Sequence, residues 1–162
     1  MRIGVLSDTH IRAGKSLPSW VFNELADVEM IFHAGDILIP QVLEDLACIA
    51  PVKAVRGNCD GWELADLPSE LLSVLEGWRI GLVHGCAGVG YDTPERAFNT
   101  FKDKGVNIII FGHSHVPYMN WLNGVLLFNP GSPTDKRRQA DYSLGIINLV
   151  KDKVEAHHIF FK

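Results

Sequence analysis

The chain has 162 residues, of which 47% are hydrophobic and 21% charged, and its formal net charge is −4. A chain of this size and composition can bury a substantial core, so we expect one soluble domain over residues 1–162. Its sequence pI of about 5.9 argues against stable nucleic-acid binding, which needs basic side chains to neutralise phosphates. The apolar runs fall far short of the ~20 residues that cross a bilayer, and Met1 leads into a strand pattern instead of a signal peptide. We therefore expect a cytoplasmic protein that does not contact membranes.

The three cysteines, Cys48, Cys59 and Cys86, form no CxxC pair. An odd number without that spacing argues against a disulfide framework and against a structural zinc site, and it fits a reducing compartment. Cys48 lies in the helical pattern VLEDLACIA, so we expect it to be a small core residue.

The first two thirds of the chain alternate between strand and helix patterns. The hydrophobic periodicity predicts a strand over 2–7, a helix over 17–27, a strand over 29–33, a helix over 40–48 and a strand over 51–55. Strands near 71–76 and 78–84, a helix over 93–104 and a strand over 107–111 follow. Because crossover connections are right-handed, the early strands should be parallel.

The last third has the pattern of two hairpins. PYMNWL and VLLFN are joined by Asn123-Gly124, and YSLGIINLV and VEAHHIFF are joined across residues 151–153. Such short turns force antiparallel pairing. The sequence therefore predicts an α/β (α+β) fold in which two mixed β-sheets pack face to face, with helices on the outside.

Residue types that bind metals follow five of the apolar runs, namely Asp8 with His10, Asp36, Asn58, His84, and His113 with His115. Strand ends converge on one edge of an α/β sheet, so these side chains should meet in a site for two divalent metals. Asp8 and His10 are separated by one residue, and so are His113 and His115. In both pairs we expect an extended backbone to point the two side chains to the same face.

The donor types indicate which metals would bind. The Asp36 carboxylate can bridge two cations, and Gly35 lets the backbone pass close to the cluster. Asn58 offers an amide oxygen, and Asp60 could accept a hydrogen bond that orients a histidine. Imidazole, carboxylate and amide donors suit manganese, iron, nickel or zinc better than calcium or magnesium.

These segments resemble, in order, the motifs of the calcineurin-like metallophosphoesterases: Asp8-x-His10, Gly35-Asp36, Gly57-Asn58-x-Asp60, His84-Gly85 and Gly112-His113-x-His115. The short N-terminus, the RGNCD variant and the NPGS segment at 129–132 resemble the small bacterial and archaeal phosphodiesterase branch. The resemblance implies a four-layer αββα sandwich, in agreement with the pattern of strands and helices.

The resemblance also implies the roles of the candidate residues. One metal would be held by Asp8, His10, Asp36 and His115, and the other by Asp36, Asn58, His84 and His113, with Asp36 as the bridge. We expect two manganese ions, with nickel, iron or zinc as alternatives. The implied activity is hydrolysis of small phosphodiesters by hydroxide from a metal-activated water that attacks in line.

Cys59 departs from the family pattern. Many relatives have histidine after the motif asparagine, where it can stabilise the phosphoryl group or protonate the leaving oxygen. A thiol is a weaker cation and a different acid. We therefore assign Cys59 to the lining of the site, without a catalytic role, and expect substrates with a good leaving group or another proton donor.

Two alternatives stay open. One is a non-catalytic protein-binding scaffold of the same fold, like the retromer subunit that resembles these enzymes; the filled ligand set favours an enzyme instead. The other is a phosphomonoesterase or nucleotide hydrolase. Few cationic side chains are visible near the motifs, which favours a diester substrate. A homodimer is a further expectation that no residue pattern establishes.

Several polar features have simpler interpretations. We expect His33, His157 and His158 to be structural. Gly14-Lys15-Ser16 is not the end of a phosphate-binding P-loop, because Thr9 stands where that motif requires glycine. The basic run Lys136–Arg138 is of a kind usually only solvated, although one arginine could reach a substrate phosphate.

Overall fold

Ten strands form two sheets in the computed structural model, which describes residues 1–162. The first sheet has the order β10 (Lys153–Phe161), β9 (Tyr142–Val150), β1 (Arg2–Leu6), β2 (Met30–His33) and β3 (Val52–Ala54). The second has the order β4 (Glu70–Leu75), β5 (Trp78–Val83), β6 (Ile108–Ile110), β8 (Val125–Asn129) and β7 (Tyr118–Leu122). Strands β1, β2 and β3 are parallel, as are β5, β6 and β8. The remaining pairs are antiparallel, so both sheets are mixed, as predicted.

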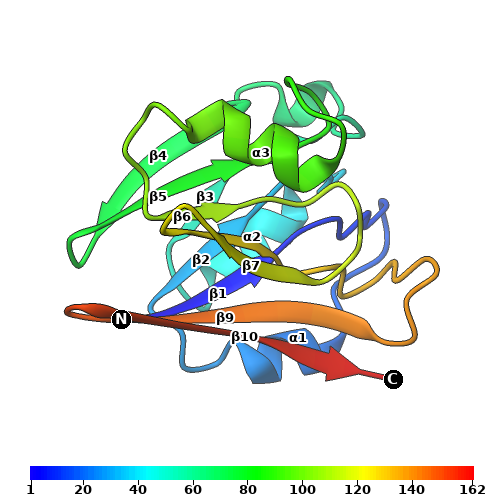
Figure 1. Ribbon diagram of the computed structural model, residues 1–162. Helices are drawn as coiled ribbons and strands as arrows, with labels where there is room; N and C mark the ends of the chain where they lie inside the picture. Colours follow the sequence, from blue (N-terminus) through cyan, green and yellow to red (C-terminus); the bar gives the residue numbers. More distant parts are fainter.

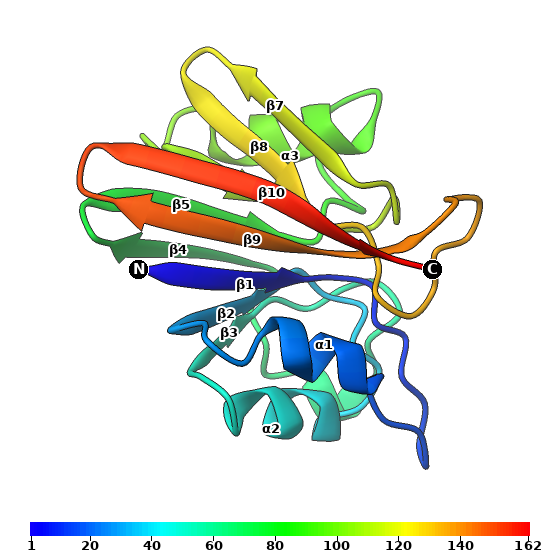
Figure 2. The ribbon, with the colours of Figure 1, turned by 90° about the horizontal axis from the view of Figure 1, so that it is seen from below.

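Helices cover the outer faces of both sheets. Helices α1 (Ser19–Glu24) and α2 (Gln41–Ala47) lie on the first sheet, and α3 (Thr93–Phe101) lies on the second. Figure 1 shows α3 at the top, α1 at the bottom and the two sheets between them, and Figure 2 shows α1 and α2 side by side. The predicted αββα sandwich is confirmed. A short 3-10 helix, Trp62–Leu64, was not predicted.

The alternation of side chains along the strands explains the long apolar runs. Ile3 and Val5 of β1 point between the sheets, where they pack with Ile108 and Ile110 of β6. Ile109, between those two, points instead to the α3 side. Because both faces of the central strands are covered, their sequences are continuously hydrophobic. None of the helices combines the length and the hydrophobicity that a membrane-spanning helix needs.

The helices are shorter than predicted, for a physical reason. Leu17 and Leu25 continue the hydrophobic pattern of α1 and are buried, but both lie outside the helix, in flanking coil or turn. The hydrophobic periodicity therefore predicted a helix that is too long, because it follows the buried side chains and not the helical backbone. Cys48 was expected in the core but is exposed just after α2, where its thiol donates to the Glu44 carbonyl at 3.4 Å.

The predicted hairpin turns are present. Asn123 and Gly124 have φ values of 51° and 79°, the conformation that a two-residue turn between antiparallel strands requires.

At the start of α3, the Asp92 side chain accepts a hydrogen bond from the Glu95 amide at 2.9 Å and caps the helix.

Candidate metal centre

The predicted ligands meet where both sheets present the carboxyl ends of parallel strands. From the first sheet come Asp8 and His10 after β1, Asp36 after β2 and Asn58 after β3; from the second come His84 after β5 and His113 with His115 after β6. All seven are brought into one cluster by side-chain and backbone contacts. The rule that functional side chains gather at the carboxyl ends of parallel strands therefore predicted where these seven side chains meet.

The backbone of this cluster is unusual. Left-handed φ values occur at Asp8 (54°), His10 (45°), Asp36 (56°), His113 (68°) and His115 (59°). The expectation of an extended backbone at the pairs Asp8/His10 and His113/His115 was wrong, because all four residues have left-handed φ values. Non-glycine residues adopt this conformation rarely and at a cost, and such residues concentrate at functional sites.

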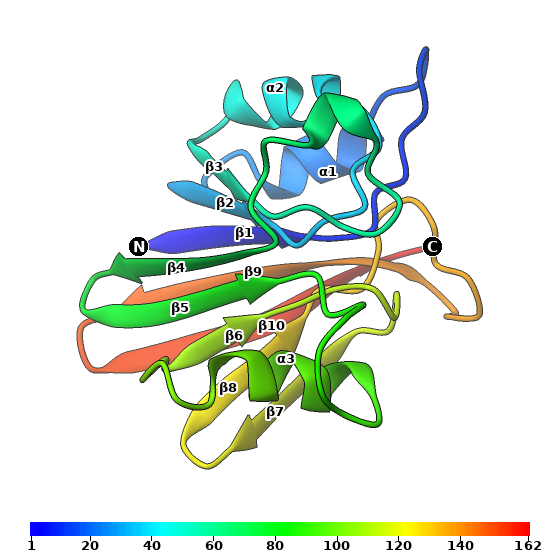
Figure 3. The same ribbon diagram turned by 90° about the horizontal axis from the view of Figure 1, so that it is seen from above.

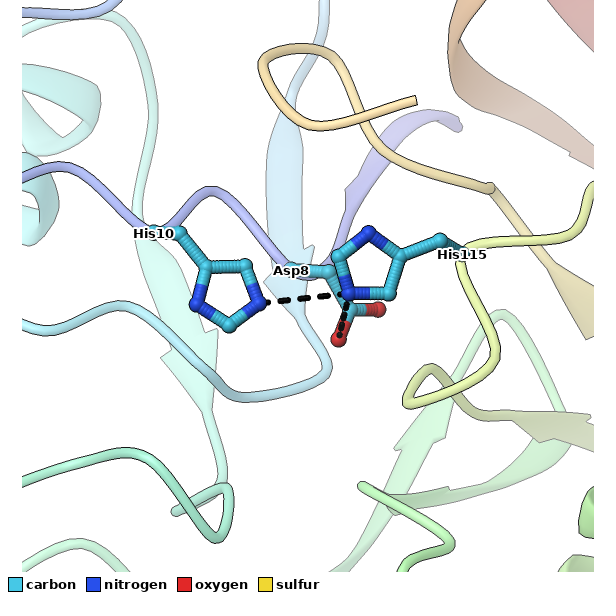
Figure 4. A group of neighbouring side chains, drawn as sticks. All are labelled: Asp8, His10 and His115. Atoms are coloured by element: carbon cyan, nitrogen blue, oxygen red, sulfur yellow. Dashed lines mark hydrogen bonds and ion pairs between the residues drawn. The ribbon is translucent and has the colours of Figure 1, made fainter. Parts of the chain in front are cut away.

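One half of the centre consists of His10, His115 and Asp8, shown in Figure 4. The Nε2 atoms of the two histidines are 3.2 Å apart, and their rings are stacked with centroids 5.1 Å apart. The Asp8 Oδ1 atom lies 3.5 Å from the His115 Nε2 atom. Three donor atoms thus converge from two loops that are more than 100 residues apart in the sequence.

The other half contains Asn58, His84 and His113. The Asn58 Oδ1 atom lies 3.0 Å from His84 Nε2 and 3.1 Å from His113 Nδ1. Asp36 Oδ2 lies 3.4 Å from His84 Nε2 and 3.6 Å from His10 Nε2. One oxygen of Asp36 is therefore positioned between the two halves.

Hydrogen bonds fix the tautomers of two histidines. His84 Nδ1 lies 2.7 Å from the Ala34 carbonyl oxygen, and His115 Nδ1 contacts the Asp135 carbonyl oxygen. A carbonyl oxygen can only accept, so each Nδ1 must carry hydrogen. The Nε2 lone pair of neutral His84 then faces the oxygens of Asn58 and Asp36, an arrangement that needs a proton or a cation between the acceptors.

Asp8 supplies a second sign that a cation fits here. Its Oδ2 atom accepts from the His113 amide at 2.9 Å, but its fully buried Oδ1 atom has no hydrogen-bond partner. A buried carboxylate oxygen without a partner is costly unless it binds a metal. Asp8, Asp36 and His84 also have one donor atom each within a common 4.8 Å, so the residues present fit a divalent metal centre.

Burial and charge shift the pKa values of these groups. Burial raises the pKa of Asp8. Burial also acts to raise the pKa of Asp36, but the hydrogen bond and charge of His84 outweigh it, so the pKa of Asp36 is lowered and that of His84 raised. Burial lowers the pKa values of His10 and His113, which favours neutral rings that can bind a metal.

Two glycines allow the ligand loops to approach closely. A Cβ atom on Gly57 would lie 2.2 Å from Asp36 Oδ1, and one on Gly35 would lie 2.7 Å from the Gly57 nitrogen. Only glycine lets these backbones pass each other. The prediction that Gly35 brings the backbone close to the cluster is confirmed.

Asp60 has a different task from the one expected. It forms no hydrogen bond or ion pair with a histidine; instead its carboxylate accepts from four backbone amides, those of Asp36, Ile37, Leu38 and Gly57. These bonds hold the turn around Asp36 against the loop that carries Asn58. Sequence reasoning found the residue but missed its partners, because backbone amides leave no signal in the sequence.

The NPGSPT segment, which begins with the last residue of β8, holds the ligand loops together by hydrogen bonds and was not predicted to do so. Asn129 donates to the Gly112 carbonyl at 2.8 Å, and Ser132 donates to the Asp8 carbonyl at 2.8 Å. Both side chains are buried. The available signal was a polar run that begins at the end of the strand VLLFN, since the ligand segments also lie at strand ends.

Cys59 lies at the edge of the centre. Its amide donates to Asp36 Oδ1 at 2.8 Å, and its sulfur is grouped with His10 and Asp36 within 4.8 Å. Burial and the neighbouring Asp36 carboxylate raise the pKa of the Cys59 thiol to about 11, so it stays protonated at neutral pH.

An open cleft of about 490 Å³ adjoins His10 and Cys59. Three cationic side chains, Arg12, Lys15 and Arg137, are among the residues that line it. The expectation that few cations lie near the motifs was therefore wrong, because Arg12 and Lys15 lie in the loop after β1, whose course the sequence pattern does not predict. The suggestion that one arginine of the 136–138 run reaches this region fits Arg137.

The three remaining histidines lie outside the centre. His33 is fully buried, with Nε2 3.1 Å from Thr9 Oγ1 and Nδ1 accepting from the Gly35 amide at 3.2 Å. His158 contacts the Asn129 carbonyl at 2.7 Å, and His157 is exposed. None belongs to a group of candidate ligands, as expected for structural residues.

Comparisons with known proteins agree with the family resemblance of the sequence motifs. The family model described as the calcineurin-like phosphoesterase superfamily domain matches residues 1–152. A probable metallophosphoesterase of Methanothermobacter thermautotrophicus is 38% identical, with 98% of this chain and 92% of that protein covered. A Methanocaldococcus jannaschii protein named as a phosphodiesterase is 29% identical, with 81% and 83% covered. The crystal structure of Chaetomium thermophilum Vps29 shares the fold, with a TM-score of 0.81, 19% identity, and 99% and 97% covered.

Proposed function

We propose that this chain, which belongs to the calcineurin-like phosphoesterase superfamily, is a phosphodiesterase that hydrolyses small phosphodiesters with two divalent metal ions. The observation that carries the proposal is the position of Asp36 Oδ2, within 3.6 Å of His10 Nε2 and 3.4 Å of His84 Nε2. A carboxylate oxygen between two sets of nitrogen and oxygen donors is the arrangement expected of a bridging ligand.

The ligands divide into two sets around that oxygen. Asp8, His10, Asp36 and His115 would hold one ion, and Asp36, Asn58, His84 and His113 the other. We propose manganese as the first choice, with nickel, iron or zinc as alternatives that the same donors accept. When bound, the two ions would lower the pKa of a water molecule and offset charge on the phosphoryl oxygens.

The protein's own groups prepare the site for this chemistry. The Ala34 and Asp135 carbonyls hold His84 and His115 with Nε2 free to bind. Asp60 keeps the Asp36 turn rigid through backbone hydrogen bonds. No histidine stands at Cys59, and a thiol with a pKa of about 11 is a weak acid. Substrates with a good leaving group should therefore react best.

The test is hydrolysis of bis-p-nitrophenyl phosphate by metal-stripped protein, with manganese, nickel, zinc and magnesium added back singly and p-nitrophenyl phosphate assayed alongside. We expect metal-restored cleavage of the diester and its loss in Asp36→Ala, which should remain folded by circular dichroism. Faster cleavage of the monoester would favour a phosphomonoesterase instead.

The alternative from another class is a non-catalytic scaffold of the same fold. The complete donor set argues against it, because a binding surface does not require a buried, unpartnered carboxylate oxygen at Asp8. Binding of two ions per chain without hydrolysis of any tested ester would favour the scaffold.

A further inference from the structure

The cleft beside the candidate metal centre concentrates positive charge in an acidic chain. Arg12, Lys15 and Arg137 line it, whereas Asp135 is the only carboxylate among its ten lining residues. The whole chain carries a formal net charge of −4. A cleft with this local excess of cations attracts anions.

Two of the cations are carried by one short turn after β1. The Lys15 amide donates to the Arg12 carbonyl at 3.0 Å, and Gly14 between them has a φ of 78°. Both side chains are exposed, and neither forms an ion pair with a carboxylate of the chain. Their charges are therefore available to a ligand.

The third cation comes from the loop between β8 and β9. Arg137 Nε lies 3.3 Å from Asp135 Oδ2, which leaves its two terminal nitrogens without partners. The carbonyl of the same Asp135 contacts His115 Nδ1, so Arg137 is tied to a residue that orients the centre. Figure 3 shows this loop, in orange, and the blue loop after β1 at the same end of the sandwich.

The cleft lies to one side of the metal centre. Among the seven candidate ligands only His10 lines it, together with Cys59. A group bound by the three cations would thus be displaced from the point between the two halves where the reacting phosphate belongs. The three cations therefore line a region beside the candidate centre and not the centre itself.

We propose that the cleft binds a second phosphate group, so that the preferred substrates are phosphodiesters in which one alcohol carries a phosphate of its own. This inference rests on the proposed phosphodiesterase function. Guanidinium groups bind phosphate through paired hydrogen bonds, and the lysine adds a mobile charge. The bound phosphate would hold the diester beside the centre, with the other alcohol as leaving group.

The experiment compares two esters with the same leaving group: thymidine 5′-(p-nitrophenyl phosphate) and its 3′-phosphorylated form. With metal-loaded protein at constant ionic strength, we expect kcat/KM to be at least about tenfold higher for the phosphorylated ester, since one charge-assisted hydrogen bond accounts for such a factor. The difference should lie mainly in KM.

The double variant Arg12→Gln/Lys15→Gln should bring the ratio of the two kcat/KM values close to one. Both residues are exposed, so the variant should fold, which its thermal unfolding checks. Arg138→Gln is the control, because Arg138 is an exposed cation beside Arg137 in the sequence that does not line the cleft. It should keep the ratio of the unmodified protein.

Equal kcat/KM values for the two esters, with both hydrolysed, would overturn the inference and leave the proposed function intact. A preference for p-nitrophenyl phosphate that disappears in the double variant would also overturn it, because the cations would then serve the reacting phosphate. No hydrolysis of either ester or of bis-p-nitrophenyl phosphate would overturn the proposed function, and this inference with it.

Discussion

Replacing Asp60 with asparagine should lower the free energy of unfolding of the metal-free protein, although Asp60 is not one of the candidate metal ligands. Asp60 is 5% exposed, and each of its carboxylate oxygens accepts two backbone hydrogen bonds. One oxygen accepts from Ile37 and Leu38 at 2.6 and 2.8 Å, and the other from Asp36 and Gly57 at 3.0 and 2.7 Å.

Asparagine keeps one of these oxygens and puts an NH2 group in place of the other. Two backbone amides then lose their acceptor and face a donor. A hydrogen bond to a charged group contributes about 1.5–3 kcal/mol, so the loss should be about 3–6 kcal/mol. That is a large part of the ~5–15 kcal/mol by which a domain is stable.

The assay is urea unfolding of the metal-free protein, followed by circular dichroism, with Asp66→Asn as the control because Asp66 is an exposed carboxylate of the same segment. The control should change the free energy of unfolding by less than about 0.5 kcal/mol. A loss below about 1 kcal/mol in Asp60→Asn, with an unchanged m-value, would show that the Asp36 turn holds itself without the carboxylate.

Three further substitutions test the buried Asp8 oxygen, the buried His33 ring and the Cys59 thiol. Asp8→Asn should raise the stability of the metal-free protein by about 1 kcal/mol, because an amide NH2 3.5 Å from His115 Nε2 replaces a buried, charged oxygen that has no hydrogen-bond partner, and it should abolish metal-dependent hydrolysis; a less stable metal-free variant in thermal unfolding would contradict this. Burial lowers the pKa of His33 from 6.5 to about 4, so the unfolded state binds the proton more tightly and stability should fall by about 3 kcal/mol from pH 7 to pH 4, with no such loss above pH 6.5. His33→Asn should lose correspondingly less in urea unfolding at the two pH values, and an equal loss would refute the assignment. Cys59→Ser should retain most of the rate on bis-p-nitrophenyl phosphate, since a thiol with a pKa of about 11 is not the expected proton donor, whereas near-complete loss would give it a catalytic role.

The strands and their pairing into hairpins were largely predictable from the sequence. The YSLGIINLV run coincides with β9, and the Asn-Gly turn lies between β7 and β8 as expected. The order of strands within each sheet was not predictable, because local patterns do not specify partners. Helix ends were misjudged where a residue such as Leu25 stays buried beyond the last helical turn.

The meeting of the seven candidate ligands in one cluster was predictable, because metal-binding residue types directly after apolar strands are easily recognised in the sequence. Their backbone geometry was not, since the left-handed conformation of Asp8 or His113 depends on contacts with distant loops. For the same reason the sequence did not reveal the carbonyl groups that orient His84 and His115. The position of Lys15 over the cleft depends on the loop after β1, which carries no pattern of its own.

The proposed phosphodiesterase reaction requires two metal ions that act together. The most direct measurement is to titrate metal-stripped protein with manganese, and to record the metal content per chain by mass spectrometry alongside the rate of bis-p-nitrophenyl phosphate hydrolysis. If the two ions act together, the chain should bind two ions at saturation and reach full activity only as the second ion binds. Full activity at one ion per chain, or no hydrolysis with two ions bound, would contradict it.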